Sequence, residues 1–278
     1  MERNKYFKVV KTQRGFEYAP GEEPEHVTFD ELKGYEDEQR KLRNRLNRIK
    51  DADDDYLREE NMIFLAGLPG TGKTDSLKAF MNKLPENCKC INIPKHSMGG
   101  GFDLVRELSN EYPQYNYFPV VEDVDIATGK DRDRGPGTNI LLENLDSTLG
   151  TEENIIVLST SNMPGKIDDA ILRPGRMSTF IRYEQPEKWE KEEIVKHYEE
   201  EYSTEVDEKL KRKIKNYEST KNPITPDHIR AIVWEYKQRN AEAGPEEGID
   251  PDDIWSSKMK RDRSIRELRE SGDDKSYA

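Results

Sequence analysis

The sequence predicts an α/β fold in which helices cover both faces of a five-stranded parallel sheet, followed by a small helical domain. Two observations lead to this prediction. Short apolar runs alternate with segments of helical character, which is typical of parallel strands joined by helices. After Pro186 the pattern changes to helices, with apolar residues at helical spacing. The predicted strands are MIFLA (62–66), CINI (90–93), YFPVV (117–121), IIVLS (155–159) and TFIRY (179–183).

Changes in composition and pattern divide the chain into four segments. Residues 1–26 contain a predicted hairpin, with Gly15 in its turn, and a linker. Residues 27–185 are expected to form the large α/β domain and residues 186–242 the small helical domain. Residues 243–278 are rich in Pro, Gly and charge, so we expect a charged, solvated C-terminal extension.

The composition argues against several classes of protein. The chain has 278 residues and a net charge of −12, whereas a protein that wraps duplex DNA is usually basic. No stretch approaches the ~20 apolar residues of a membrane span, and the N-terminus lacks the apolar run of a signal peptide. With four histidines and two cysteines, Cys88 and Cys90, we expect neither a zinc site nor a disulfide, which fits a reducing cytoplasm.

The segment GLPGTGKT (67–74) matches the phosphate loop Gly-x-x-x-x-Gly-Lys-Thr/Ser, and it stands between a predicted strand and a predicted helix. Glycines let the backbone turn sharply and direct its N–H groups at phosphate oxygens. Lys73 supplies a point charge for the β- and γ-phosphates, and Thr74 offers its hydroxyl to Mg²⁺. The predicted nucleotide-binding residues here are Gly67, Leu68, Pro69, Gly70, Thr71, Gly72, Lys73, Thr74 and Asp75.

A second segment, FPVVEDVD (118–125), places three carboxylates at the end of a predicted strand. Mg²⁺ prefers oxygen ligands and keeps several waters that carboxylates can hold. Because this strand should lie beside the one that precedes the phosphate loop, we expect Mg²⁺ and its nucleotide to face the acids, with Thr74 and Glu122 as metal ligands. Pro119 lacks a backbone N–H, so we expect the regular strand to begin after it.

Over roughly residues 27 to 240 the chain resembles the AAA ATPases, a family of P-loop NTPases with a small α-helical lid domain. Beyond the phosphate loop and the acids, VTFDELKGYEDEQRKLR (27–43) resembles the family's entry segment. Leu141-Leu142-x-x-Leu145-Asp146 resembles the helix after the acidic strand. STSNMPGKIDDAILRPGRM (159–177) resembles the second region of homology. The resemblance implies an ATPase that uses ATP and Mg²⁺.

The resemblance also implies roles for single residues. Asn162 stands at the sensor position that orients the attacking water. Arg173 and Arg176 stand at the arginine-finger positions, from which they would reach the γ-phosphate in a neighbouring subunit of a hexameric ring. Lys33-Gly34-Tyr35 would flank the adenine, and Pro226-Asp227 would begin the lid helix near it. The implied catalytic residues are Lys73, Glu122, Asp123, Asn162, Arg173 and Arg176.

Three features depart from the family's pattern. The order Glu122-Asp123 reverses the usual Asp-Glu, as in the branch with the mitochondrial translocase of the Rieske iron–sulfur protein. By position Glu122 takes the Mg²⁺-water role and Asp123 polarises the attacking water, but shared roles stay open because Asp is shorter. Asp75 replaces an apolar residue and adds negative charge near the phosphates. KHSMGGGF (95–102) replaces the loop that grips polypeptide, so Met98-Gly99 could act there or belong to a flexible surface loop.

These observations lead to a preferred function and three alternatives. The preferred function is an ATP-hydrolysing ring that remodels, threads or disassembles a protein or a complex. A nucleic-acid motor or clamp-loader-like ATPase is the alternative, against which stand the net charge and the mixed charges of TGKDRDRGPG (128–137). An ATP-gated scaffold with slow turnover stays open because the acid pair is reversed. RPGR (173–176) argues against a P-loop kinase for a small molecule.

Overall fold

The computed structural model describes residues 4–51, 61–124, 154–163, 177–220, 222–242 and 250–259. The chain forms two compact units. The first unit comprises Met1–Leu32 and Glu36–Glu184, and the second comprises Lys33–Tyr35 and Gln185–Ala278. In the described ranges, no helix is long and apolar enough to cross a membrane.

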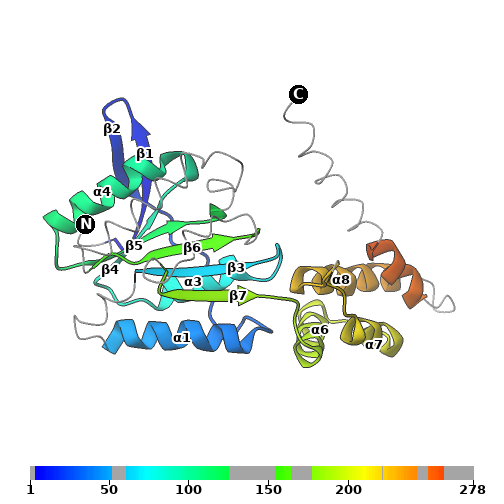
Figure 1. Ribbon diagram of the computed structural model, residues 1–278. Coiled ribbons are helices and arrows are strands. Elements are labelled where there is room, and N and C mark those ends of the chain that lie inside the picture. The colour runs from blue at the N-terminus through cyan, green and yellow to red at the C-terminus, as the bar shows by residue number, and fades with distance from the viewer. Residues whose placement is uncertain are drawn as a thin grey trace. The chain divides into compact units, whose positions relative to one another are not determined.

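The first unit contains a seven-stranded sheet in the order β2-β1-β4-β5-β6-β3-β7 (Figure 1). The five predicted strands are present and parallel, which confirms the α/β fold. The predicted hairpin, β1 (Tyr6–Thr12) and β2 (Gly15–Pro20), joins the same sheet because β1 pairs in parallel with β4. The other strands are β3 (Met62–Gly67), β4 (Cys88–Asn92), β5 (Asn116–Val121), β6 (Val157–Ser161) and β7 (Thr179–Tyr183).

Helices cover both faces of this sheet (Figure 1). α1 (Glu36–Asp51) and α3 (Lys73–Lys83) pack together on one face, and α4 (Met98–Glu111) covers the other. All residues of β3 and β6 are buried, as expected for parallel strands covered on both sides. The buried residues of α1 are Gln39, Leu42, Leu46 and Ile49.

Pro119 lies inside β5, opposite Ile91 of β4, so the prediction that the regular strand begins after Pro119 is wrong. The backbone N–H and C=O groups of Tyr117 both form hydrogen bonds with the chain just before β6. Residues two apart in a strand direct their backbone polar groups to the same side. The missing N–H of Pro119 therefore faces β6. The ladder between β5 and β6 begins at Val120, after the proline. On its other side β5 stays paired with β4, because the missing N–H does not face that strand.

The segment KHSMGGGF is not a loop. Lys95–Ser97 form a short 3₁₀ turn, and α4 starts at Met98. Met98 is 2% exposed and packs in the core with Phe102 and Val105. The expectation that Met98-Gly99 belongs to an exposed loop, whether one that grips polypeptide or a flexible one, is therefore wrong.

The glycines of this segment let α4 approach the hairpin and the sheet closely. A Cβ at Gly100 would lie 1.9 Å from Cδ2 of Phe16 in β2, far inside van der Waals contact. At Gly101, a Cβ would lie 2.6 Å from Cγ2 of Ile93. The glycine run is thus a packing surface for the Phe16 ring and for the residue after β4.

The second unit is built from α6 (Lys188–Tyr202), α7 (Glu208–Asn216) and α8 (Pro226–Glu242). Residues 251–259 are also helical, and Ile254 is fully buried in the same core. Part of the segment that we expected to be solvated is therefore packed. The buried core residues are Ile194, Val195, Val206, Leu210, Ile214, Ile224, Ile229, Ile232, Val233 and Ile254.

Candidate nucleotide-binding and hydrolysis site

The phosphate-loop segment joins the end of β3 to the start of α3. Gly70 and Gly72 adopt left-handed φ angles of 77° and 80°, which glycine takes without steric cost. A Cβ at Gly72 would meet no atom within 4 Å, so the space beside this residue is open. α3 begins at Lys73, and the N–H groups of a helix's first turn point toward its N-terminal end. Backbone donors beside open space are what a phosphate chain requires.

Gly67 serves the sheet as well as the loop. It pairs with Tyr183 of β7, and a Cβ on Gly67 would lie 2.3 Å from the Tyr183 carbonyl oxygen. A side chain at this position would therefore push β3 and β7 apart. The first glycine of the motif is required here by strand packing, which the sequence pattern alone did not indicate.

Lys73 lies against the loop's own carbonyl groups. Its Nζ donates to the Gly67 oxygen at 2.8 Å and to the Leu68 oxygen at 2.6 Å, and the residue is 5% exposed. Thr71 donates from Oγ1 to the same Leu68 oxygen at 2.8 Å. These bonds hold the ammonium group within the loop, where a point charge can meet phosphate oxygens.

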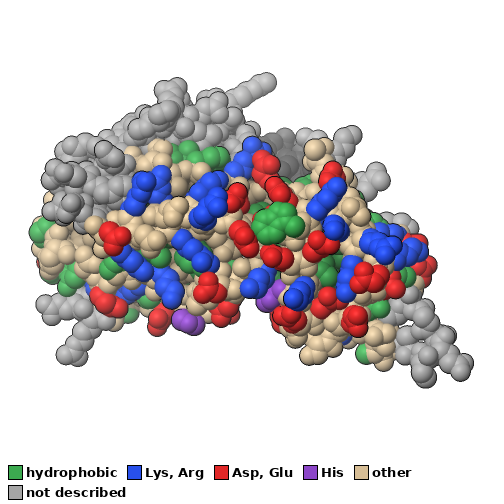
Figure 2. All heavy atoms as spheres, turned by 90° about the horizontal axis from the view of Figure 1, so that it is seen from below, with side chains coloured by type: hydrophobic (Ala, Val, Ile, Leu, Met, Phe, Trp, Pro, Cys, Tyr) green, Lys and Arg blue, Asp and Glu red, His purple; other side chains and the backbone are tan. Residues whose placement is uncertain are grey.

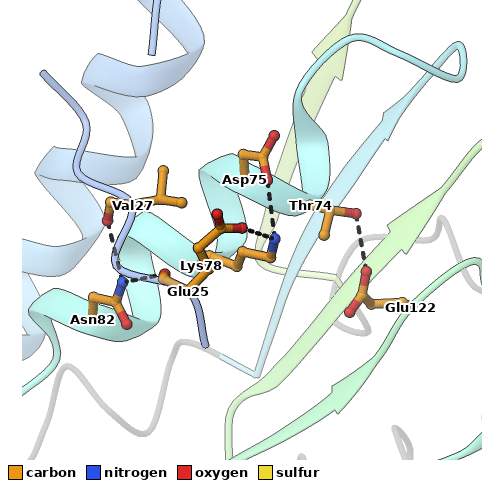
Figure 3. Close-up of polar contacts among 7 residues, drawn as sticks. All are labelled: Glu25, Val27, Thr74, Asp75, Lys78, Asn82 and Glu122. Atoms are coloured by element: carbon orange, nitrogen blue, oxygen red, sulfur yellow. Dashed lines mark hydrogen bonds and ion pairs between the residues drawn. The ribbon is translucent and has the colours of Figure 1, made fainter. Parts of the chain in front are cut away.

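Thr74 and Glu122 come together as the metal prediction requires. Thr74, in the first turn of α3, donates from Oγ1 to Oε2 of Glu122 at 2.9 Å (Figure 3). Glu122 directly follows β5. Because β6 lies between β5 and β3 in the sheet, the expectation that the acidic strand lies beside the strand before the phosphate loop is wrong. A hydroxyl and a carboxylate side by side are oxygen ligands of the kind that Mg²⁺ prefers. The residues present therefore fit a magnesium ion.

Asp123 forms a second cluster beside the first. Its backbone is left-handed, with a φ of 49°, and its N–H donates to Oγ1 of Thr160 at 2.9 Å. Its Oδ1 accepts from Nδ2 of Asn162 at 2.6 Å. The ends of β5 and β6 thus place the predicted water-polarising acid against the predicted sensor residue, while the preceding acid turns to Thr74.

Lys95 is a neighbour of this cluster that sequence reasoning missed. Its Nζ lies 3.7 Å from Oδ2 of Asp123, and both side chains are partly exposed. An available signal was its place just after the predicted strand CINI, because the carboxyl ends of parallel strands meet at one edge of a sheet. Partly exposed ion pairs are worth at most about 1 kcal/mol, so this pair adds little to the stability of the site.

Asp75 is balanced by a cation of its own helix. Lys78 Nζ lies 3.2 Å from Asp75 Oδ1 and 3.5 Å from Glu25 Oε2 (Figure 3). Burial lowers the pKa of Lys78, but the bonds to Asp75 and then to Glu25 outweigh it, so the pKa is raised. Asn82 Nδ2 also donates to the carbonyl oxygens of Glu25 and Val27. The extra acid thus belongs to a polar cluster that fastens the N-terminal segment to α3.

Other predicted site residues do not join these clusters in the first unit. Lys33, Gly34 and Tyr35 belong to the second unit, where Tyr35 N–H donates to Glu190 Oε1 at 2.5 Å. Pro226 and Asp227 begin α8 of that unit. Their contacts with adenine remain predictions, and Asp125, Arg173 and Arg176 lie outside the described residues.

Comparisons with known proteins agree with this geometry. Residues 63–185 match the model of the "ATPase family associated with various cellular activities (AAA)". An "AAA ATPase forming ring-shaped complexes" of Bifidobacterium dentium is 29% identical over 201 residues, which cover 64% of this chain and 38% of that protein. The "ATP-dependent zinc metalloprotease FtsH" of Caldicellulosiruptor bescii is 31% identical over 193 residues, which cover 61% of this chain and 30% of that protein.

A further relative, an "AAA ATPase forming ring-shaped complexes" of Micrococcus luteus, is 31% identical over 203 residues, 60% of this chain and 33% of that protein. The chain therefore spans between 30% and 38% of the length of these three relatives. The similarity covers the ATPase core. Residues 63–185 are therefore a domain of the AAA family of ATPases.

Proposed function

We propose that this chain binds ATP with Mg²⁺ at the phosphate loop, hydrolyses it, and works as a ring that remodels, threads or disassembles a protein substrate. The observation that carries the catalytic part is the meeting of two residue pairs at the ends of neighbouring strands. Thr74 bonds to Glu122, and Asp123 bonds to Asn162. One pair suits a metal ion and the other suits a water molecule, and both stand by the phosphate loop.

The loop and the first pair would bind the substrate and its metal. The N–H groups at the start of α3 and the Lys73 ammonium would bind the phosphate oxygens. Thr74 and Glu122 would hold Mg²⁺, which supplies positive charge to phosphate oxygens when bound. The balance of Asp75 by Lys78 supports this proposal, because it offsets the extra negative charge beside the loop.

The second pair would activate water. Asp123 would accept a hydrogen bond from the attacking water and take its proton, while Asn162 would orient that water and the carboxylate. Asp is one methylene shorter than the Glu usual at this position. The left-handed backbone of Asp123 and its bond to Thr160 fix where the shorter side chain points.

The ring is the less direct part of the proposal. Two of the similar proteins are named as forming ring-shaped complexes, which supports assembly of identical subunits. Arg173 and Arg176 of one subunit would then act on the nucleotide of its neighbour in a hexamer. A protein substrate and a cytoplasmic location complete the proposal. The first rests on the sequence pattern and the net charge of −12, and the second rests on Cys88 and Cys90, for which no disulfide is expected.

The variant Asp123→Asn tests the proposal. It should still bind ATP but release phosphate about 100-fold more slowly, because an amide cannot take the proton. Asp103→Asn is the matched control, because Asp103 lies on α4 and pairs with Arg106. Mass photometry in ATP and in ADP measures the assembly, and mass spectrometry with nuclease digestion identifies what co-purifies from lysate.

A hexamer that holds a defined protein in ATP is the expected result. A monomer that hydrolyses ATP at the full rate, or an unchanged rate in Arg173→Ala, would contradict the ring. If nuclease digestion removes the captured material, the substrate is a nucleic acid and not a protein.

A further inference from the structure

A cavity of about 320 Å³ lies in the first unit between α1 and β7. One face of the helix and the chain around the start of the strand line it, and Figure 1 shows α1 running alongside β7. None of these lining residues is acidic. They are Lys41, Asn44, Arg45 and Arg48 from α1, together with Ser178, Thr179, Phe180 and Ile181.

β7 is an edge strand of the described sheet. It pairs in parallel with β3 from Thr179 to Tyr183, and the strand order ends with it. Alternate residues of an edge strand direct their N–H and C=O groups away from the paired neighbour. Such an edge can pair with an added strand from another polypeptide, which gains main-chain hydrogen bonds in doing so.

The cations of α1 match the length and the repeat of such an added strand. Lys41, Arg45 and Arg48 stand at i, i+4 and i+7, so they lie on one face of the helix over about 10 Å. Residues 178–181 span about the same length at about 3.3 Å per residue. Side chains on one face of a strand repeat at about 7 Å, close to the about 6 Å between Lys41 and Arg45 along the helix.

The charge of this surface favours an acidic polypeptide. Figure 2 shows Lys and Arg side chains gathered, with acidic ones among them, over the part of the first unit that carries α1. The whole chain has a net charge of −12, so three cations around one cavity stand out locally. A nucleic acid would match the charge, but its backbone lacks the alternating N–H and C=O groups that pair with a strand edge.

We propose that this surface binds an extended acidic segment of a partner polypeptide, which adds to the sheet beside β7 and places alternate carboxylates against Lys41, Arg45 and Arg48. The two guanidinium groups can each bind a carboxylate through two hydrogen bonds. Arg45 and Arg48 also contact other groups of this chain. An incoming carboxylate would have to displace those contacts.

The test measures binding of a fluorescein-labelled peptide that alternates Glu and Thr to the full chain, by fluorescence anisotropy. The double variant Arg45→Gln/Arg48→Gln should bind at least about tenfold more weakly. A peptide with Gln in place of Glu should bind more weakly by a similar factor. A peptide with alternate N-methylated amides should also bind at least about tenfold more weakly, because it cannot pair with the edge of β7.

The matched control is Arg40→Gln/Lys50→Gln. It removes the same charge from the same helix but lies outside the cavity lining, so binding should stay within about twofold of the original chain. Thermal unfolding of both double variants shows whether each is folded. Equal losses of peptide affinity in the two folded double variants would show that binding depends only on the overall charge of the helix, and this would overturn the proposal.

Two further outcomes would overturn it. Tight binding of a single-stranded oligonucleotide, with no binding of the acidic peptide, would assign the surface to nucleic acid. The sequence directly after α1, ADDDYLREE (52–60), is itself acidic. If replacing its Asp53, Asp54 and Asp55 by Asn strengthens peptide binding more than about tenfold, the occupant is this chain's own segment and not a partner.

Discussion

Two glycine-rich segments of this chain stand at helix starts, yet their glycines do different work. In the phosphate loop, Gly70 and Gly72 have left-handed backbones, and the space beside Gly72 is open. At the start of α4, Gly100 and Gly101 are helical, and neighbouring side chains fill the space where a Cβ would stand. The first segment leaves room for a ligand, and the second receives the Phe16 ring.

The difference shows how to distinguish a glycine-rich binding loop from a glycine-rich packing site such as the start of α4. The phosphate loop ends in Lys73, which donates to the loop's own carbonyl groups, and Thr74, which donates to Glu122 at the end of β5. The glycines of α4 are flanked by Met98 and Phe102, which are both buried in the core. Glycines next to polar groups on open space indicate a site, whereas glycines between buried apolar residues indicate close packing.

The largest effect is expected at the phosphate loop. Lys73→Met should lower ATP hydrolysis by at least about 100-fold, because the charge that meets the phosphate oxygens is lost. Phosphate release and binding of a fluorescent ATP analogue measure the change, and circular dichroism checks the fold. Hydrolysis within about twofold of the original rate would remove Lys73 from the proposed site.

A smaller effect is expected at the packing site at the start of α4. Gly100→Ala should lower the free energy of unfolding by about 1–2 kcal/mol, because the new Cβ meets the Phe16 ring. In the background Phe16→Ala the same change should stabilise the protein by about 0.5–1 kcal/mol, since Ala favours a helix over Gly. Denaturant unfolding of the single and double variants measures both. A cost that persists without the ring would contradict the role of Phe16.

The matched substitution in the loop should behave differently. Gly72→Ala should cost about 1 kcal/mol, because a residue with a Cβ is strained at a φ of 80°. That cost should be the same with and without Phe16→Ala, because the two residues share no contact. The same double-variant cycle measures this cost. Coupling between Gly72 and Phe16 would contradict the conclusion that only the glycines of α4 pack against the Phe16 ring.

The last comparison concerns β4, the strand that joins the hairpin to the rest of the sheet. Burial raises the pKa values of Cys88 and Cys90 from 9.0 to about 12. At pH 8 both thiols should react with Ellman's reagent at least about 100-fold more slowly in the folded chain than in denaturant. Fast reaction without denaturant would mean that the sheet opens readily around β4.

The same shifts set a pH dependence of stability. On unfolding, the thiols return to a pKa of 9.0, so above that pH the unfolded chain releases protons that the folded chain retains. The free energy of unfolding should therefore fall as the pH rises from 9 toward 12. The replacement Cys88→Ala should flatten this fall in denaturant unfolding at several pH values.

Local patterns made the strands and the phosphate loop predictable. Each of the five parallel strands is a short apolar run, and the loop has a fixed spacing between β3 and α3. The pairing of Thr74 with Glu122 was predicted from the adjacency of β5 and β3, which is wrong, but it holds because parallel strands end at one edge of the sheet. These features depend on neighbours in sequence and on one general rule of topology.

Long-range contacts made the rest unpredictable from one sequence. Phe16 reaches Gly100 across more than 80 residues, and without that contact the glycine run suggests an exposed loop. Ile254 packs into the helical core although its surroundings are rich in charge. Lys95 meets Asp123 only because β4 and β5 are neighbours, which single-residue patterns do not reveal.

The most direct test separates the two neighbouring carboxylates by measuring ATP hydrolysis against Mg²⁺ concentration. Glu122→Gln should raise the Mg²⁺ concentration for half-maximal hydrolysis at least about tenfold, because Glu122 would hold the ion with Thr74. Asp123→Asn should leave that concentration within about twofold and lower the saturated rate about 100-fold. The reverse pattern, with the Mg²⁺ requirement shifted in Asp123→Asn and not in Glu122→Gln, would contradict the proposed division of roles.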